Sequence, residues 1–496
     1  MNLKKCTECY ERAQDIDKQG RFRLFYKLVK AHFQVNKGGG QMNKDSLAKL
    51  IPSRNDVFLA YRIFNGQMAL VDLTQRTLNI LNTTATRIWQ LIGDGMTVSK
   101  ITERMCQEFE VPFGEATDDI ITVLREMASR GWIRNFPSEN SGGEIVVSDD
   151  TAIFEQLREE AVQGQIPLVV HFDLTYRCNL HCVHCYLTGC KKQSECTTEE
   201  IKNILAQLAE AGALYLTLSG GEIFLRKDLP EIVREARKLH FAVRLLTNGT
   251  LIDDEMVDEI AKWYPEMLVF SVYDLDPSVH DGITKKHGSL VKTLNVISAL
   301  RERNVPIKIS AVLMQSNISG YRRLYNFAKE IGAQFQVDYR ITPKIDGSQA
   351  PLQYHITDSE AKQVLGDPVF SREYKTTGPD PTQGYSGVFN EIPCGAGHMS
   401  CYISPYGMIT PCVQVPIGCG SLRKKSFLEI WSNSSELKAF RAIRLSDMPK
   451  CAKCKLFAYC RPCPGLNLVE TGDLLTPPPR VCKEAEHMKI LNKKRR

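Results

Sequence analysis

The chain has 496 residues, of which 43% are hydrophobic and 24% charged, and its formal net charge is +6. This length suits about three globular domains. No apolar run reaches the roughly 18 residues that a membrane span needs, no signal peptide is recognisable at the start, and the dispersed positive charge is too weak to indicate nucleic-acid binding. We therefore expect a cytoplasmic protein with neither a membrane nor a nucleic acid as a partner.

The cysteines are distributed unevenly along the chain. Of the 17 cysteines, three lie within residues 178–185 and nine within residues 394–482. The cytosol keeps thiols reduced, so a disulfide framework of this size is not expected there. The clustering instead predicts metal or redox ligation.

Residues 1–54 are expected to form a helical N-terminal appendage that ends near a flexible joint at Gly38-Gly39-Gly40. It contains a lone C-x2-C pair, Cys6 and Cys9, which we interpret as two surface thiols.

Residues 55–136 predict a compact unit. Alternating apolar residues predict strands at 58–63, 68–72 and 77–81, followed by helices at 83–92, 97–109 and 114–129. An Asn65-Gly66 turn joins the first two strands. Three strands and three helices predict a small winged-helix-like domain, which a linker and a helix in residues 137–165 connect to the rest of the chain.

Residues 166–345 predict an α/β fold in which strands and helices alternate. Strands are expected at 167–174, 214–218, 242–246, 267–272, 307–313 and 334–340, with helices at 197–211, 228–239, 256–263, 289–303 and 320–331. This alternation predicts a partial (β/α)6 barrel, whose chemistry lies at the carboxyl ends of the strands. Residues 346–390 are expected to bridge to a cysteine-rich C-terminal domain in residues 391–490.

The first cysteine motif directly follows the first strand of the predicted barrel. Cys178, Cys182 and Cys185 form a C-x3-C-x2-C loop. Thiolates are soft ligands that suit iron–sulfur clusters. Three cysteines around four irons would leave one iron without a protein ligand, as a catalytic metal requires. A zinc site, or three cysteines brought together by chance, is the alternative.

This loop resembles the signature of the radical SAM superfamily, with His184 where that family usually has an aromatic residue. The resemblance implies a [4Fe–4S] cluster that cleaves S-adenosylmethionine (SAM) to start radical chemistry. It also implies SAM contacts at the ends of later strands, namely at Ser219, Gly220, Gly221, Glu222, Thr247, Asn248, Ser271 and Asn317. In this interpretation the Gly-Gly turn allows close backbone approach and Glu222 faces the SAM ammonium. Ordinary strand-end capping remains the alternative for Thr247, Ser271 and Asn317.

The C-terminal cysteines resemble the SPASM domain of radical SAM enzymes that act on peptides and proteins. The motif begins with Cys394, Cys401 and a Gly407-x4-Cys412 segment, and ends with Cys451-x2-Cys454-x5-Cys460-x2-Cys463 and Cys482. The resemblance implies two auxiliary [4Fe–4S] clusters, which makes three clusters in all. One would be held by Cys394, Cys401, Cys412 and Cys463, and the other by Cys451, Cys454, Cys460 and Cys482.

Two departures from the SPASM pattern leave alternatives open. Two residues separate Cys460 from Cys463, where the family usually has three. Several peptide maturases have no cysteine at the position of Cys401, so a first auxiliary cluster with three ligands, open to a substrate sulfur, is the alternative. A pair of zinc knuckles is the alternative for the whole domain.

The unit at 55–136 resembles the PqqD-like domain that recognises precursor peptides. The resemblance lies in residues 66–72, 78–82 and 87–91. It implies that a leader peptide adds a strand at 77–81 and lies against the helix at 114–129. A DNA-binding winged helix is disfavoured because Asp118, Asp119 and Glu126 make that helix acidic.

Together the motifs predict a radical SAM peptide maturase that binds a ribosomally synthesised precursor through its leader. Residues 219–224, 394–397 and 402–407 most resemble the thioether-forming sactipeptide and ranthipeptide maturases, which implies a cysteine sulfur-to-carbon cross-link. An electron donor such as flavodoxin or ferredoxin is the second expected partner. A carbon–carbon cross-linking or quinone-cofactor maturase and a non-catalytic iron–sulfur scaffold are the alternatives. No catalytic acid or base is assigned, and Cys419 has no assigned role.

Overall fold

The computed structural model describes residues 43–138, 150–187, 193–369, 391–460 and 462–493. The chain divides into two units, residues 1–50 and 51–496. In the first unit, helix α3 (Lys44–Ala48) begins where Asn43 accepts a 2.9 Å hydrogen bond from the Ser46 amide. Cys6, Cys9, the triglycine and Cys190 lie outside the described residues.

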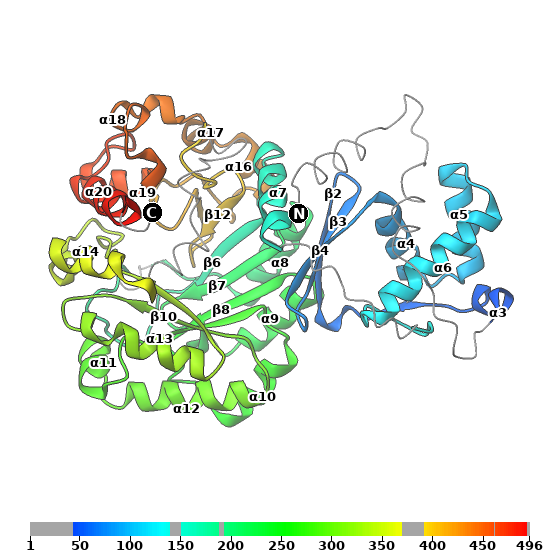
Figure 1. The fold of residues 1–496 in the computed structure, drawn as a ribbon, viewed down its shortest axis with the longest axis horizontal. Coiled ribbons are helices and arrows are strands. Elements are labelled where there is room, and N and C mark those ends of the chain that lie inside the picture. Colours follow the sequence, from blue (N-terminus) through cyan, green and yellow to red (C-terminus); the bar gives the residue numbers. More distant parts are fainter. Residues whose placement is uncertain (1–42, 139–149, 188–192, 370–390, 461, 494–496) are drawn as a thin grey trace. The chain divides into compact units, whose positions relative to one another are not determined.

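The second unit begins with a small domain around a three-stranded antiparallel sheet (Figure 1). The strands are β2 (Leu59–Phe64), β3 (Gln67–Asp72) and β4 (Thr77–Leu81), and the helices are α4 (Thr83–Gly93), α5 (Val98–Phe109) and α6 (Phe113–Ser129). Asn65 and Gly66 both have positive φ, as the predicted Asn-Gly hairpin requires. Short strands β1 (Ser53–Arg54) and β5 (Ile133–Arg134) pair and bring the two ends of this domain together.

The central sheet confirms the predicted α/β fold. Its parallel strands are β6 (Val169–Thr175), β7 (Tyr215–Gly220), β8 (Ala242–Thr247), β9 (Met267–Ser271), β10 (Ile307–Val312) and β11 (Gln334–Asp338), and they are neighbours in chain order. The helices between them are α8 (Thr198–Glu210), α9 (Leu229–Lys238), α10 (Asp254–Lys262), α12 (Ser289–Glu302) and α13 (Tyr321–Glu330).

The two faces of the sheet differ in polarity because side chains alternate along each strand. On β6, Val170, Phe172 and Leu174 pack into the large apolar core beneath the helices. His171 and Asp173 lie on the opposite face. The same alternation leaves that inner face polar, as expected for a surface that meets small molecules or peptides.

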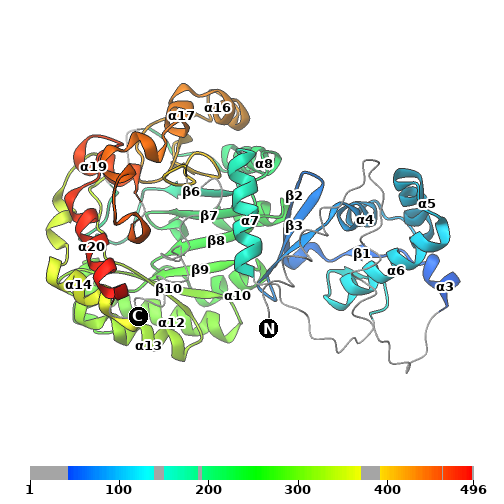
Figure 2. The ribbon, with the colours of Figure 1, turned by 45° about the horizontal axis from the view of Figure 1, so that its top comes forward.

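The C-terminal domain adds strands to this sheet, which was not predicted from the sequence. Figure 2 shows the parallel strands β6 to β10 that these strands extend. Strand β12 (Ser400–Ile403) pairs in parallel with β6, and β13 (Met408–Thr410) and β14 (Gly420–Ser421) continue the sheet beyond it. Helix α14 (Asp358–Gly366) lies in the region that bridges to this domain, and the described helices of the domain are α16 (Phe427–Asn433), α17 (Ser435–Arg441), α18 (Pro449–Ala452), α19 (Pro464–Thr471) and α20 (Pro479–Lys493). Helix α11 (Pro277–Thr284) was also not predicted, although Asp276 caps its start.

The small domain packs against the amino ends of the central strands. Helix α7 (Asp150–Gln163) and the three-stranded sheet share an apolar cluster with Leu168, Leu214 and Ala242, which lie at the starts of β6, β7 and β8. At its other edge, β2 meets the turn before β8, where the Tyr61 amide donates a 3.2 Å hydrogen bond to the His240 carbonyl. None of the described helices combines the length and apolar character that crossing a membrane requires.

Candidate active site

The C-x3-C-x2-C loop lies at the carboxyl end of β6, where its three thiols are grouped. Cys178 is exposed, and Cys182 and Cys185 are half-buried. Burial, followed by the charges of Cys185 and Cys178, raises the pKa of Cys182 to about 12. Such a mutual influence requires the three sulfurs to be near one another.

The Gly-Gly turn after β7 packs directly against the backbone that precedes this loop. The Gly221 amide donates a hydrogen bond of 2.8 Å to the Thr175 carbonyl. A β-carbon on Gly220 would lie 2.1 Å from the Thr175 oxygen, and one on Gly221 would lie 2.2 Å from the Arg177 oxygen. Only glycine fits at these two positions. The Gly-Gly turn therefore fixes the position of the backbone that leads into the cysteine loop.

Glu222 is fully buried, and both of its carboxylate oxygens accept hydrogen bonds from protein donors. One oxygen accepts from the Thr247 hydroxyl at 2.8 Å and from the Phe224 amide at 3.1 Å, and the other accepts from the Asn248 amide at 2.8 Å. Burial raises the pKa of Glu222. That this carboxylate faces the SAM ammonium stays a prediction, and in the structure its hydrogen bonds with Thr247 and Asn248 hold the turn after β8 in place.

Asn248 connects the turn after β8, which Glu222 holds in place, to the cysteine loop. Its side-chain amide donates a 3.0 Å hydrogen bond to Asn179 and lies 4.0 Å from the Cys178 sulfur. Thr247 donates to Glu222 and accepts from the Gly249 amide at 2.9 Å. Of the residues expected to contact SAM, Glu222, Thr247 and Asn248 therefore lie together beside Cys178.

Ser271 and Asn317 have different surroundings. Ser271 ends β9 and shares a hydrogen bond with the Tyr273 hydroxyl, which lies beside Cys182. Asn317 is completely buried. Its side-chain oxygen accepts a hydrogen bond from the Met314 amide, and its side-chain NH2 group donates to the Tyr273 and Val312 carbonyls. For Asn317, the structure supports the capping alternative.

His184 takes the place of the usual aromatic residue in the loop. Its ring packs edge-on against Tyr273, with the ring centroids 4.8 Å apart. Burial lowers the pKa of His184 to about 4. The neutral imidazole therefore packs as an aromatic ring would.

Four of the C-terminal cysteines form a second group. They are Cys451, Cys454, Cys460 and Cys482. Burial raises the pKa of Cys460 to about 12; the charge of Arg340 opposes this, while the other three thiols add to it. The four thiols come from α18, the following turns and α20, so a shared cluster would tie these segments together.

The structure brings three of the other four cysteines together and separates the last. Burial raises the pKa of Cys412, with a smaller contribution from the nearby Cys463 thiol, and Cys394 and Cys412 pack on the same small apolar cluster. Cys401 instead points from β12 into the large core beneath the helices, where the neighbouring thiol is Cys419. The pairing of β12 with β6 fixes this orientation, because alternate residues of a strand face opposite sides.

The donor chemistry of these groups fits iron–sulfur clusters. Within the described residues, no three Cys, His, Asp or Glu side chains converge closely enough to hold a single metal ion. A zinc site needs its ligands around one ion, whereas the thiolates of a four-iron cluster each bind a different iron. The thiols of both groups are the soft ligands that an iron–sulfur cluster takes.

A buried hydrogen-bonded network on the inner face was missed by the sequence analysis. Asp173 is 3.0 Å from the His171 imidazole and accepts a 2.8 Å hydrogen bond from the Tyr402 hydroxyl, which is itself 2.7 Å from the Tyr176 hydroxyl. Tyr186 lies near enough for Asp173, Cys185 and Cys412 to raise its pKa, after the larger effect of burial. The alternation of polar His171 and Asp173 with apolar neighbours in β6 was the available signal.

Three protein-family models match parts of the chain. Residues 172–328 match the radical SAM superfamily, residues 67–133 match coenzyme PQQ synthesis protein D, and residues 394–455 match an iron–sulfur cluster-binding domain known as SPASM. These matches confirm the three family resemblances that the sequence motifs suggested.

Curated relatives share part of the chain. An AdoMet-dependent heme synthase of Methanosarcina barkeri is 28% identical over 63% of this chain and 95% of its own length. The subtilosin biosynthesis protein AlbA of Bacillus subtilis is 27% identical over 61% of this chain and 68% of its own length. A PqqA peptide cyclase of Xanthomonas axonopodis pv. citri is 30% identical over 64% of this chain and 88% of its own length.

The fold also matches a solved structure. Streptococcus suis SuiB, determined bound to its precursor peptide SuiA, superposes with a TM-score of 0.59 and 17% sequence identity, over 87% of this chain and 99% of SuiB. At this identity the likeness concerns the fold, and it agrees with the architecture described above.

Proposed function

Because the chain belongs to the radical SAM superfamily of enzymes, we propose that it is a maturase that binds a precursor peptide by its leader and installs cysteine sulfur-to-carbon thioether cross-links. Cys178, Cys182 and Cys185 would hold a [4Fe–4S] cluster, which when bound supplies the electron that splits SAM into methionine and a 5′-deoxyadenosyl radical. The enzyme's own side chains position the reactants and exclude water.

The observation that carries the thioether proposal is the separation of Cys401 from Cys394, Cys412 and Cys463. A four-iron cluster held by three thiolates has one iron free for a substrate sulfur. Thioether formation removes a hydrogen atom from carbon, a proton from the thiol and one further electron. The three-thiol group would hold a cluster whose chemistry includes accepting such an electron.

The residues around the loop have positioning roles in this proposal. Glu222 fixes the turn after β8 by accepting a hydrogen bond from the Asn248 amide. The Asn248 side chain in turn contacts Asn179 and Cys178, so it orients the cysteine loop. The network of His171, Asp173 and Tyr402 provides polar groups on the inner face, between the SAM-cleaving loop and the three-thiol group.

The leader would add a strand to the sheet of the small domain at β4. The opposite edge strand, β2, meets His240 of the central domain, so β4 is the edge left for backbone pairing within the described residues. A small pocket beside this edge is lined by Ala69 and Ile80 of the sheet and by Ile153 and Leu157 of α7. Helix α7 therefore lies beside β4. The sequence predicted α6 as the helix that the leader lies against, and α7 is a second helix next to the proposed leader site.

The first test is SAM cleavage by the reconstituted protein. Reduced with dithionite under anaerobic conditions, the wild type should form 5′-deoxyadenosine and methionine, and the Cys182→Ala variant should form neither. Absence of 5′-deoxyadenosine from a wild-type protein that carries its full iron content would support the non-catalytic scaffold alternative and contradict the proposal.

A carbon–carbon cross-linking maturase remains the second candidate, because the chain shares 30% identity with a PqqA peptide cyclase. Such an enzyme would also cleave SAM, but its product would keep every cysteine thiol free. The state of the cysteines in the modified peptide therefore separates the two candidates.

A further inference from the structure

An exposed basic face lies beside the loop that carries Cys178. We define the basic face by two apolar residues, Leu251 and Val291, and three lysines, Lys285, Lys286 and Lys292. Leu251 is 40% exposed and Val291 is 54% exposed, and the three lysines are exposed as well. Single exposed apolar side chains are ordinary on a protein surface, and this face is distinguished by the positive charge of its lysines.

Backbone hydrogen bonds attach this face to the cysteine loop on one side. The His181 amide donates to the Thr284 carbonyl at 3.1 Å, and the Val183 amide donates to the Ile283 carbonyl at 3.1 Å. Thr284 ends α11, and Lys285 and Lys286 follow it directly. These two lysines therefore lie next to the loop.

A side-chain hydrogen bond also joins the basic face to the cysteine loop, on the side where Leu251 lies. Asn179, which follows Cys178, donates a 2.8 Å hydrogen bond to the Thr250 hydroxyl, and Leu251 is the next residue. Cys178 itself is exposed. A protein that covered Leu251 would thus be separated from Cys178 by little more than Thr250 and Asn179.

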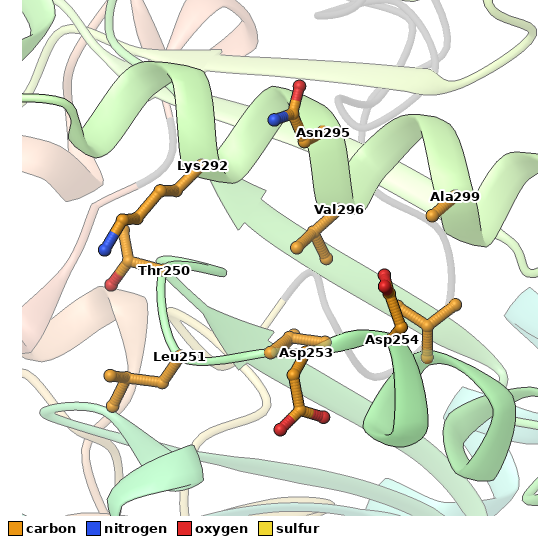
Figure 3. A pocket seen from close by; sticks show the side chains of 10 residues that line it. Thr250, Leu251, Asp253, Asp254, Lys292, Asn295, Val296 and Ala299 are labelled. Carbon is orange, nitrogen blue, oxygen red and sulfur yellow. The ribbon is translucent and has the colours of Figure 1, made fainter.

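The surface is hollowed at this point by a cavity of about 370 Å³ between α10 and α12. Figure 3 shows Lys292, Thr250 and Leu251 at one end of the cavity and Asp254 towards the other. Asp253, which also lines the cavity, uses its carboxylate to cap α10 at the Met256 amide. Among the residues that line the cavity, Lys292 is the cation, and it lies at the end that Thr250 and Leu251 occupy.

Within the described part of the chain, no ion pair engages the ammonium groups of Lys285, Lys286 or Lys292. Unpaired surface charges of one sign attract partners of the opposite sign and accelerate their association. We propose that the basic face docks a small acidic one-electron carrier protein. This inference rests on the proposed function. Each encounter oxidises the carrier by one electron, which enters through the Cys178 loop and is consumed in SAM cleavage.

A second basic surface provides a matched control. Lys450, Lys453 and Lys455 alternate with Cys451 and Cys454, and all three lysines are exposed. This surface adjoins the four-thiol group of the C-terminal domain rather than the SAM-cleaving loop. Charge reversal there should leave delivery of the SAM-cleaving electron unchanged.

The test compares two electron sources on the reconstituted holoenzyme. The triple variant Lys285→Glu/Lys286→Glu/Lys292→Glu should form 5′-deoxyadenosine at least ~10-fold more slowly than the wild type when a reduced flavodoxin is the donor at low ionic strength. With dithionite, a small reductant that needs no docking, the two rates should agree within about twofold. The control Lys450→Glu/Lys453→Glu/Lys455→Glu should resemble the wild type with both donors.

Binding of oxidised flavodoxin gives a readout that does not depend on turnover. Measured by surface plasmon resonance, the affinity of the wild type should fall steeply with added salt, and that of the triple variant should be at least ~10-fold weaker at low salt. Equal flavodoxin affinities for the two proteins would overturn the inference, as would a larger loss in the control variant. A wild type that binds flavodoxin but cleaves no SAM with dithionite would refute the proposed function and leave the docking result standing.

Discussion

Tyr402 donates a hydrogen bond of 2.8 Å to Asp173, and both side chains are buried. Tyr402 belongs to β12 of the cysteine-rich domain, whereas Asp173 belongs to β6, the strand that leads into the Cys178 loop. The cysteine-rich domain is therefore not a separate appendage. It extends the central sheet and places its own thiols near the inner face on which SAM cleavage is proposed to occur.

Removal of this contact should destabilise the protein. Tyr402→Phe leaves one oxygen of the buried Asp173 without its donor, which should cost ~1–3 kcal/mol of unfolding free energy. Tyr176→Phe is the matched control, because it removes only the hydroxyl pair with Tyr402 and leaves the bond to Asp173 in place. Urea unfolding should show the larger decrease for Tyr402→Phe. Equal decreases would contradict a dominant role for the Asp173 contact.

Cys401 should be dispensable for iron binding. Its thiol lies in the apolar core away from Cys412, so Cys401→Ala should retain the ~12 Fe per chain expected for three four-iron clusters. Cys412→Ala should lose up to ~4 Fe per chain. Iron analysis of anaerobically reconstituted protein measures both. A comparable loss from Cys401→Ala would restore Cys401 to the ligand set.

Binding of the leader peptide should depend on the exposed edge of β4. Ile80 on β4 and Ile63 on β2 are almost equally exposed, at 40% and 41%. Ile80→Asp should weaken leader binding by ~10-fold, because it places a charge at the edge where side-chain pockets are expected to read the peptide. Ile63→Asp should change it little. Fluorescence anisotropy with a labelled leader tests the pair, and equal effects would exclude β4 as the docking edge.

The length of the peptide between leader and modification site should have a minimum. The small domain lies at the amino end of β6, and the Cys178 loop lies at its carboxyl end. The seven residues of β6 span ~23 Å at about 3.3 Å per residue. Spacers shorter than ~7 extended residues should therefore abolish modification, while Gly/Ser insertions should be tolerated. Mass spectrometry of a deletion series checks this, and full modification with a three-residue spacer would contradict it.

The contact between His240 and Tyr61 should make stability depend on pH. The two rings stack with centroids 4.2 Å apart, and burial, aided by Arg62, Arg237 and Arg54, lowers the pKa of His240 from 6.5 to about 4. Between these values the unfolded chain binds a proton that the folded chain does not. Stability from this group is therefore present above pH 6.5 and is lost as the pH falls towards 4.

The comparison between wild type and His240→Asn isolates this effect, since asparagine tolerates the positive φ at this position. From pH 5 to 7 the difference in unfolding free energy should move in favour of the wild type by at most ~1.4 kcal/mol per pH unit, because a single proton is involved. The fully exposed His287, replaced in the same way, is the control. A difference that stays constant over this range would remove His240 as the cause.

Local patterns were enough to predict most of the fold, whereas long-range pairing was not accessible from sequence. The hydrophobic periods predicted β6 to β11 and their helices, and the cysteine spacings predicted which thiols to consider. The side of β12 on which Cys401 lies depends on pairing with β6, more than 200 residues earlier in the chain. No local rule contains that information.

The roles of polar residues were the least predictable part of the site. Glu222 and Asn317 both stand at strand ends, and their sequence contexts suggested SAM contacts. In the structure, both side chains are completely buried and are engaged by backbone groups. Whether a polar side chain at a strand end faces a ligand or its own backbone depends on packing of the neighbouring turns. The Asn248 contact with Cys178 arises in the same way.

Thioether formation is tested most directly by mass spectrometry of a precursor peptide co-expressed with the enzyme, before and after alkylation. A thioether-forming maturase should give a peptide that loses two hydrogens for each cross-link. The cross-linked cysteine should resist alkylation, and backbone fragments should be missing between this cysteine and the residue that carries its partner carbon. A peptide that loses two hydrogens while every cysteine is alkylated would contradict thioether formation and would favour a carbon–carbon bond.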